Sequence, residues 1–461
     1  TRMEEVANIE NNCISLRTKR RYHTTACLFI IWAYYNHRGI LRREFSEQVD
    51  AVLLVQSSAL AQRKALRQLV ITRWLEKMER RRPELCPVDV SLLSYDIVST
   101  YMTTKKREEG RYLGRGSYDN IRSSIIYLFT MSNTSPPPGF RNSMTTLLKG
   151  FTRTIVGQRV EAGESLEEGK EVMSFECLKL LCKKFFEGQN DEYHFAHLFL
   201  LLEWNLIARS DNIVHLHVND FEWESDSLLI FLKRSKHDQE GQHGRTPFHI
   251  FFNSENPYLN IGLSLGMYFF SHPGVLSNPK NRLFSARFQY NRYAVILNKV
   301  IEDNRAEFEQ IGVRPGVIGS HSARKGAATL AASGCTVSPS MASICTRAGW
   351  KLGGTRDKYI KFENAGDQYL GRVLCGLNCL TMEFSVSPPF FDLPVSELNE
   401  QIDRTIMGIV AGGTRINAAT FEVLRMCYAC VVFHREFLAE HLDDHNRFRA
   451  SAALTHMPEV S

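Results

Sequence analysis

The sequence predicts a mainly α-helical protein with one small β-sheet, an α+β layout. Most apolar residues recur at helical spacing along segments of helix length. Two short apolar runs, Ser227–Leu232 and Pro247–Phe252, flank the polar stretch 233–245, which is typical of two paired strands. A chain of 461 residues suffices for two to four domains, and its 44% hydrophobic and 23% charged residues exclude a disordered or fibrous protein.

The front portion is predicted to be a helical domain over residues 1–157. Helical periodicity covers Tyr22–Tyr35, Ala59–Arg80, Ser117–Met131 and Ser143–Val156. The third of these segments is followed by Pro136–Pro138, which stops a helix because proline has no backbone N–H to donate. The polar, glutamate-rich stretch 157–169 then indicates a linker, placed at 158–171.

A second domain is predicted over residues 172–380, because helical patterns there surround the paired strands. The expected helices are Phe175–Phe186, Glu192–Ala208, Gly262–Phe270, Tyr290–Gln310, Ser322–Ser333 and Met341–Ala348. Residues 381–461 contain further helical segments but no recognised motif, and we expect them to form a C-terminal helical extension.

Charge is distributed unevenly between the two predicted portions. Residues 1–150 hold 24 Lys and Arg against 14 Asp and Glu, a net charge of +10, whereas the remainder has 32 against 36, a net charge of −4. A basic front portion indicates a polyanionic partner.

The sequence carries no secretion or membrane signal. Its eleven cysteines are an odd number in a long chain, which is typical of reduced intracellular thiols. The apolar run Ala26–Tyr35 is too short to span a bilayer, and the run Phe195–Ala208 is interrupted by Glu203 and Asn205. We therefore expect a soluble protein. The sequence begins at Thr1 rather than at a methionine, which is expected of a fragment or a processed chain.

Six residues suited to phosphate chemistry follow one another through the second domain. Arg209 comes directly after an apolar helix, and a lysine lies in the polar turn between the paired strands. A His-x-x-Arg motif places two side chains on one helix face, and a tyrosine follows a tryptophan by nine residues. Alone, each is an ordinary surface or packing residue. The ordered set is Arg209, Lys236, His321, Arg324, Trp350 and Tyr359.

This order and spacing resemble the catalytic domain of tyrosine recombinases of the phage-integrase type. The resemblance covers about Phe199–Leu377, and the part His321–Leu377 is most similar to recombinases of Crypton-type eukaryotic mobile elements. The front portion is similar to the helical core-binding domain of that family, which with the catalytic domain would close around duplex DNA.

The resemblance implies roles for the six residues. Tyr359 would attack a phosphate and form a 3′-phosphotyrosine ester that conserves the bond energy for rejoining. Arg209 and Arg324 would stabilise the charge on the non-bridging oxygens. The lysine would protonate the leaving 5′-oxygen, His321 would exchange a proton with Tyr359 or a phosphate oxygen, and the Trp350 indole N–H would bond a phosphate oxygen.

Three assignments depart from the family pattern or leave alternatives. Lys236, 27 residues after Arg209, best fits the position of the general acid, and Lys233 is the alternative. The acidic residue usual three positions after the first arginine is Asn212 here, and Asp211 is the nearby carboxylate. Tyr369 has the wrong spacing from the tryptophan, so we expect it to be a packing residue.

Two further patterns of residues occur in the sequence. Cys427 and Cys430, followed by His441 and His445, have spacing close to a zinc site, but the segment Val423–Leu442 predicts one amphipathic helix with packed cysteines, so no metal is expected. The basic residues of the front portion predict phosphate contacts with duplex DNA. They are Lys19, Arg20, Arg21, Lys105, Lys106, Arg107, Arg111 and Arg115.

The resemblance implies a metal-independent enzyme that cuts and rejoins DNA for a mobile element. Double-stranded DNA would be its partner and it would assemble as a tetramer on DNA, with no cofactor, no small-molecule substrate and no membrane. The basic clusters also suit nuclear import, so a nuclear location is expected. The alternative is a non-catalytic DNA-binding protein derived from such a recombinase. A type IB topoisomerase shares the chemistry, but the Crypton-like ending favours recombination.

Overall fold

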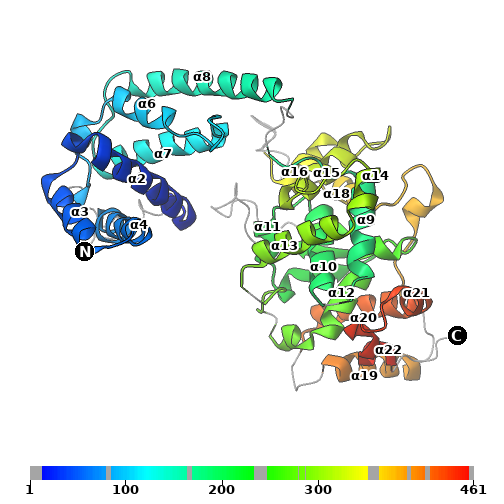
Figure 1. Cartoon of the computed structure of the whole chain (residues 1–461). Coiled ribbons are helices and arrows are strands. Elements are labelled where there is room, and N and C mark those ends of the chain that lie inside the picture. Colours follow the sequence, from blue (N-terminus) through cyan, green and yellow to red (C-terminus); the bar gives the residue numbers. More distant parts are fainter. Residues whose placement is uncertain are drawn as a thin grey trace. The chain divides into compact units, whose positions relative to one another are not determined.

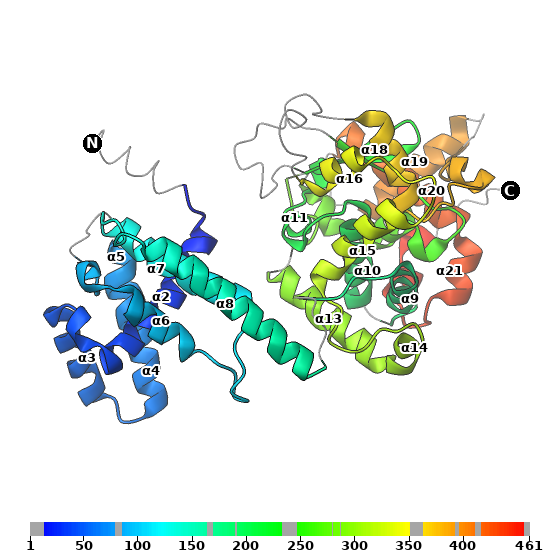
Figure 2. The same ribbon diagram turned by 90° about the horizontal axis from the view of Figure 1, so that it is seen from above.

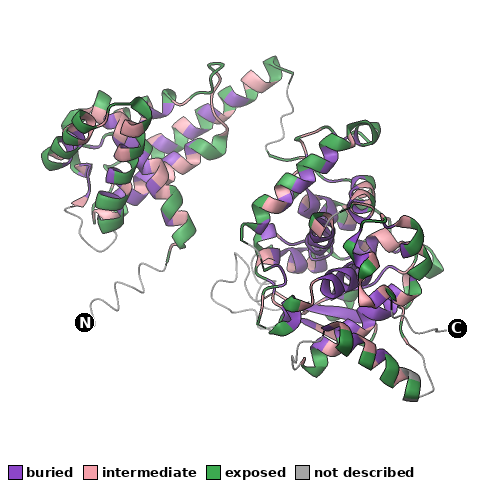
Figure 3. Ribbon diagram, turned by 60° about the horizontal axis from the view of Figure 1, so that its bottom comes forward, coloured by how far each residue is buried: buried purple, intermediate pink, exposed green. Residues whose placement is uncertain are grey.

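The computed structural model divides the chain into two compact units, Thr1–Glu168 and Gly169–Ser461 (Figure 1). The boundary falls within the predicted linker. The structure describes residues 13–78, 85–163, 169–189, 191–232, 247–278, 280–285, 287–350, 363–391, 396–410 and 416–455. Its described part is mainly helical with one three-stranded antiparallel sheet, so the predicted α+β class is confirmed at that level. In each unit the buried residues gather in the interior (Figure 3).

Unit 1 is all-helical in its described part. Its elements are α2 (Leu16–Asn36), η1 (Arg38–Ile40), α3 (Arg43–Val55), α4 (Ala59–Gln68), the π-helix η2 (Leu69–Leu75), α5 (Glu76–Met78), η4 (Val90–Leu92), α6 (Tyr95–Thr103), α7 (Arg115–Met131) and α8 (Phe140–Glu161). α7 and α8 are joined through stacked rings of Tyr118 and Phe151, whose centroids are 4.1 Å apart. Figure 2 shows α8 extending past the other helices of this unit.

The long helix α8 differs from its predicted bounds at both ends. It begins at Phe140, directly after Gly139, whose φ of 78° is readily adopted only by glycine. It ends at Glu161, so the helix reaches into the segment 158–171 that was predicted as linker. Residues 157–159 are half-buried and residues 160–161 are exposed, and all but Gly157 have side chains compatible with a helix, so the polar composition of this stretch did not end the helix.

Unit 2 is built around α10 (Asp191–Asn205). Residues His194–Asn205 of this helix are all buried, as expected for a helix that is apolar on every side. Its neighbours include α9, α12, α13 and α15. The helical elements of unit 2 up to residue 385 are α9 (Phe175–Phe186), α10, α11 (Ser210–Val214), η5 (Val218–Asp220), η6 (Pro257–Leu259), α12 (Ile261–Ser271), η7 (Pro273–Ser277), α13 (Gln289–Asp303), α14 (Arg305–Gln310), α15 (Ser320–Ser333), α16 (Met341–Ala348), α18 (Asn364–Leu374) and η8 (Met382–Ser385).

The sheet has the order β1-β2-β3, and the two strands predicted from the sequence are β2 (Ser227–Phe231) and β3 (Pro247–Ile250). They pair antiparallel, with Phe231 opposite Pro247. The third strand, β1 (Phe221–Glu224), was not predicted, because it is short and half acidic; it pairs with β2 through a two-residue turn. Pairing with β2 therefore defines this strand more than its own side chains do.

The predicted C-terminal extension shares one hydrophobic core with the rest of unit 2. It forms α19 (Ser396–Val410), α20 (Ala418–Phe433), α21 (Arg435–His441), η9 (Arg447–Ala450) and α22 (Ala452–Thr455). α20 lies against α12 and β1. At Gly266 a Cβ atom would lie 3.0 Å from the carbonyl oxygen of Cys427, so glycine permits the close approach of α12 and α20.

The cysteines of the zinc-like pattern are packing residues of α20. Cys427 and Cys430 are fully buried, and burial raises the pKa of both thiols. The His441 ring stacks on Phe437 with the centroids 4.2 Å apart. None of the described helices is both long and apolar enough to cross a bilayer.

Candidate active site

Arg324 is held at the centre of the candidate site. It lies on the first turns of α15 and is only 8% exposed. Its Nη1 donates to the carbonyl oxygen of Ile207 at 2.7 Å, and its Nη2 donates to the carbonyl oxygen of Ala348. A guanidinium has more N–H donors than these two bonds use, so it is fixed in place and can still bind an oxyanion.

The turn that presents Arg209 is strained. α10 ends at Asn205, and Ile207 then has φ of 45°, a conformation that β-branched residues rarely adopt. Arg209 follows in extended conformation as the residue before α11, and its carbonyl oxygen accepts from the N–H of Asn212 at 2.8 Å. Since the carbonyl of Ile207 is the acceptor for Arg324, the strained turn ties the two arginines of the predicted set together.

A buried carboxyl group of α10 forms a hydrogen bond with this turn. Glu203 of α10 is fully buried, and its Oε1 accepts a hydrogen bond from the hydroxyl of Ser210, the residue after Arg209. Burial raises the pKa of Glu203 well above its usual value, which favours the neutral carboxyl. The sequence showed Glu203 only as an interruption of an apolar run. The signal that could have identified Glu203 as a functional residue is a carboxyl side chain inside an otherwise apolar helix.

His321 is one helical turn before Arg324 on the same side of α15. Partial burial and then the nearby positive charges of Arg324, Arg209 and Lys325 lower its pKa. The same proximity lowers the pKa of Arg324, after burial, to about 10, which leaves that guanidinium charged at neutral pH. The imidazole is therefore neutral at pH 7 and able to accept a proton.

Trp350 is positioned by the end of α16. Gly349 adopts φ of 63°, and the backbone N–H groups of Gly349 and Trp350 donate to the carbonyls of Thr346 and Cys345 at 3.0 and 2.8 Å, which is a Schellman motif. The indole that follows is 41% exposed, and the Arg324 Cζ lies 5.5 Å from its ring centroid. The Gly-Trp pair of the sequence is thus a helix stop that places an aromatic ring beside the arginine.

A pocket of about 620 Å³ lies between α15 and α16. His321, Arg324, Lys325 and Trp350 belong to its polar and aromatic wall, and Ala328 and Ile344 are part of its apolar wall. The pocket therefore combines two cations, a neutral imidazole and an indole. That is a suitable environment for one oxyanion such as a phosphate.

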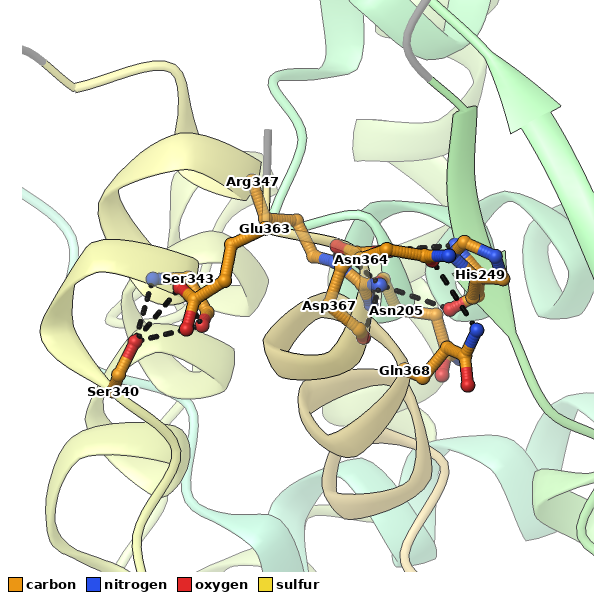
Figure 4. Close-up of polar contacts among 9 residues, drawn as sticks. All are labelled: Asn205, His249, Ser340, Ser343, Arg347, Glu363, Asn364, Asp367 and Gln368. Carbon is orange, nitrogen blue, oxygen red and sulfur yellow. Dashed lines mark hydrogen bonds and ion pairs between the residues drawn. The ribbon is translucent and has the colours of Figure 1, made fainter. Parts of the chain in front are cut away.

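A buried ion pair clamps the elements around the site (Figure 4). Arg347 of α16 bonds Asp367 of α18, with Nη2 2.7 Å from Oδ1, and also donates to the carbonyls of Asn205 at 3.0 Å and His249 at 2.9 Å. Asp367 Oδ2 in turn accepts from the backbone N–H of His249 at 2.8 Å. Burial alone would raise the pKa of Asp367, but Arg347 and the His249 hydrogen bonds outweigh it and hold that pKa below its usual value.

The sequence did not single out this ion pair, because its partners come from α10, β3, α16 and α18 and share no local pattern. A second polar contact in Figure 4 joins the same helices: Glu363, just before α18, accepts from the hydroxyls of Ser340 at 3.1 Å and Ser343 at 2.8 Å. Trp350 thus follows the C-terminal end of α16, and Glu363 binds its N-terminal end. Both flanks of residues 351–362 are anchored on one short helix.

The structure brings together four of the six predicted catalytic residues: Arg209, His321, Arg324 and Trp350. Lys236, its alternative Lys233 and Tyr359 lie outside the described residues. Lys236 belongs to the connection between the paired strands β2 and β3. Tyr369 is part of α18, and its ring lies against Phe384 with the centroids 5.1 Å apart.

The predicted DNA-contacting residues belong to unit 1, and several also make contacts within it. Lys19 is buried, with 7% of its surface exposed. The Nζ atoms of Lys105 and Lys106 lie 4.4 and 4.9 Å from the ring centroids of Tyr101 and Tyr112. Arg111 pairs with Glu109, and Arg115 lies 3.4 Å from Asp119.

Arg20, Arg21 and Arg107 are exposed. The first two lie on the opening turns of α2, which runs antiparallel to α7, because Tyr22 contacts Tyr127 near the far end of α7. Arg107 precedes the start of α7. Arg107 lies in a turn closed by the Lys106–Tyr112 bridge, beside Gln158 and Arg159 of α8.

No protein-family model matches the chain, and a search of curated proteins finds no match. The candidate site consists of two arginines, Arg209 and Arg324, that are connected through one strained turn, with His321 and Trp350 beside Arg324.

Proposed function

We propose that this protein cleaves and rejoins DNA strands through a phosphotyrosine intermediate, as the recombinase of a mobile element. The observation that carries the proposal is the cluster of His321, Arg324 and Trp350 at one pocket, with the charge of Arg209 close enough to lower the pKa of His321 and Arg324. Titratable groups with shifted pKa values that line one pocket are typical of a functional site, and helix packing alone does not bring them together.

The pocket suits a phosphodiester because its fixed groups match the charge that develops in the transition state. The guanidinium of Arg324 binds a negative non-bridging oxygen, and its rigid anchoring means that little reorganisation accompanies the reaction, while nearby Arg209 adds a second positive charge. The indole N–H of Trp350 is a further donor.

The proposed cleavage step conserves the phosphate ester. The Tyr359 oxygen bonds to phosphorus while the bond to the 5′-oxygen of the next nucleotide breaks, and neutral His321 accepts the tyrosine proton. Lys236 donates a proton to the departing 5′-oxygen. Attack by a 5′-hydroxyl of a partner strand reverses these steps and releases Tyr359.

The anchored flanks of the two outlying segments support these roles. Residues 351–362 follow Trp350 at the pocket and precede Glu363, which accepts a hydrogen bond from Ser343 of α16. Residues 233–246 join β2 to β3, and Arg347 of α16 donates to the carbonyl of His249 in β3. In the same proposal the exposed arginines of unit 1 bind duplex phosphates, the protein assembles as a tetramer on DNA, and it acts in the nucleus.

The test is to trap a covalent adduct. The full-length protein is mixed with a pool of labelled duplexes of randomised sequence, each carrying a nick beside the cleavage window, so that the released fragment diffuses away and the adduct persists. We expect a labelled band of protein size on a denaturing gel for the wild type and for Tyr369→Phe, and no band for Tyr359→Phe.

Two other outcomes discriminate between the functions. Salt-sensitive DNA binding by the wild type without any adduct would favour a non-catalytic DNA-binding protein. An equal adduct yield from wild type and Tyr359→Phe would refute the nucleophile and with it the proposed reaction.

A further inference from the structure

Two cysteines are in contact on the surface of unit 2. Cys335 lies in the connection between α15 and α16, Cys379 follows α18, and their Sγ atoms are 3.0 Å apart. Both are partly exposed, whereas eight of the eleven cysteines are buried and the remaining one, Cys13, belongs to unit 1. A small oxidant can therefore reach this pair and little else in unit 2.

Hydrogen bonds make the two thiols unequal. Cys379 donates its S–H to Cys335 Sγ, and the backbone N–H of Val337 donates to the same sulfur at 3.4 Å. These bonds favour the thiolate of Cys335, so its pKa is lowered while that of Cys379 is raised. Because the thiolate is the reactive form, Cys335 is the sulfur that meets an oxidant first and Cys379 is the resolving thiol.

A tyrosine holds the loop of Cys335 against α18. The hydroxyl of Tyr369 donates to the carbonyl oxygen of Val337 at 2.7 Å, two residues after Cys335. α15, α16 and α18 also pack against one another. The two sulfurs are therefore brought together by packing of the reduced protein, and a bond between them needs only a small further approach.

We propose that Cys335 and Cys379 are a thiol modification site at which a hydroperoxide forms one intramolecular disulfide. The Cys335 sulfur takes an oxygen atom from hydrogen peroxide to give a sulfenic acid and water, and the Cys379 thiol then displaces a second water as the S–S bond forms. Two thiols and one peroxide thus yield one disulfide and two waters, and a dithiol reductant returns both thiols.

The cross-link would close a loop of about 45 residues that holds α16 and α18. Restricting that loop in the unfolded chain raises the melting temperature of unit 2, by roughly 5–10 °C for a domain of this size. The inference is independent of the proposed strand-transfer activity, because its readout is a bond and a melting temperature.

The test uses the full-length protein, reduced, freed of reductant and treated with hydrogen peroxide. Free thiols are blocked by an alkylating reagent in denaturant before tryptic digestion and mass spectrometry. We expect a link between the peptides 326–347 and 373–404, with fragment ions placing it on Cys335 and Cys379 rather than on the buried Cys345 and Cys375. Dithiothreitol should remove both the link and the rise in melting temperature.

Single-cysteine variants test whether the disulfide joins Cys335 to Cys379. Cys335→Ser and Cys379→Ser should each abolish the link and the temperature shift, whereas Cys13→Ser, at an exposed single cysteine, should retain both. The reduced variants should melt within a few degrees of the reduced wild type, which shows that they fold. Alkylation of both Cys335 and Cys379 after peroxide treatment, oxidation of either one alone to a sulfinic acid, or a link that persists in Cys335→Ser would overturn the proposal.

Discussion

The guanidinium of Arg324 donates a 2.7 Å hydrogen bond to the carbonyl oxygen of Ile207, a residue held at φ of 45°. This bond joins α15 to the turn that presents Arg209. It also compensates the strain of that turn, since a β-branched residue in this region costs about 1–3 kcal/mol. One side chain is thus placed both to bind an anion and to hold the site together.

Arg324→Ala should therefore lower the free energy of unfolding by about 2–4 kcal/mol, because two backbone carbonyls lose their charged donor. Urea denaturation measures the effect. Lys325→Ala is the control: its Nζ bonds the carbonyl of Lys170 at the surface, and its loss should cost less than about 1 kcal/mol. Equal costs for the two variants would contradict the structural role of Arg324.

Gly349→Ala should cost about 1 kcal/mol, because alanine is strained at φ of 63°. Gly150→Ala is the matched control. Gly150 lies inside α8 with open space around its Cβ position, so alanine there should stabilise the protein by about 0.5–1 kcal/mol. The same sign for both substitutions in thermal melts would contradict the left-handed conformation of Gly349 at the end of α16.

The buried pair of Arg347 and Asp367 predicts strong coupling. Arg347→Met and Asp367→Asn should each cost about 3–5 kcal/mol, since each leaves its partner without compensation. The double variant should cost clearly less than the sum of the two. A double-mutant cycle measured by denaturation tests this, and additive costs would mean that the pair does not act as a unit.

The pKa of Asp367 gives this pair a pH dependence. Its folded-state value lies below the unfolded value near 3.9, so the stabilisation is present above about pH 4 and is lost as the pH falls through the lower, folded value. Below that range the free energy of unfolding of the wild type should no longer exceed that of Asp367→Asn. A constant difference between the two proteins from pH 7 to pH 3 would contradict the ionised state of Asp367.

Glu203 should show the opposite dependence. Its folded-state pKa is raised, so its contribution to stability is complete below the unfolded value near 4.3 and declines as the pH rises toward the folded value. Glu203→Gln removes this decline, so its free energy of unfolding should rise relative to that of the wild type as the pH increases above about 4. Unfolding free energies measured over that range test it, and a wild type that gains on the variant would mean that the carboxyl is ionised.

The sequence predicted the parts of this molecule that carry a local pattern. The helices around Arg209, His321 and Arg324 follow from apolar periodicity, and the strands β2 and β3 follow from two apolar runs. These are properties of neighbouring residues, and they are visible before any tertiary contact is known.

The rest depends on contacts between distant parts of the chain. Arg347 gave no signal because its partners lie in three other elements, and Cys335 meets Cys379 only because α15, α16 and α18 pack together. Helix α20 was predicted to lie in a separate extension, although it completes the core of unit 2. Tertiary packing determines these three arrangements, and the composition of the sequence does not reveal them.

The most direct test of the proposed chemistry is the chemical identity of the protein–DNA linkage. The trapped adduct is digested with protease and nuclease, and the modified peptide is sequenced by mass spectrometry. We expect a nucleotide joined through its 3′-phosphate to Tyr359, with a free 5′-hydroxyl on the released strand. A nucleotide attached to another residue, or cleavage that leaves a 5′-phosphate and no adduct, would contradict the proposed chemistry.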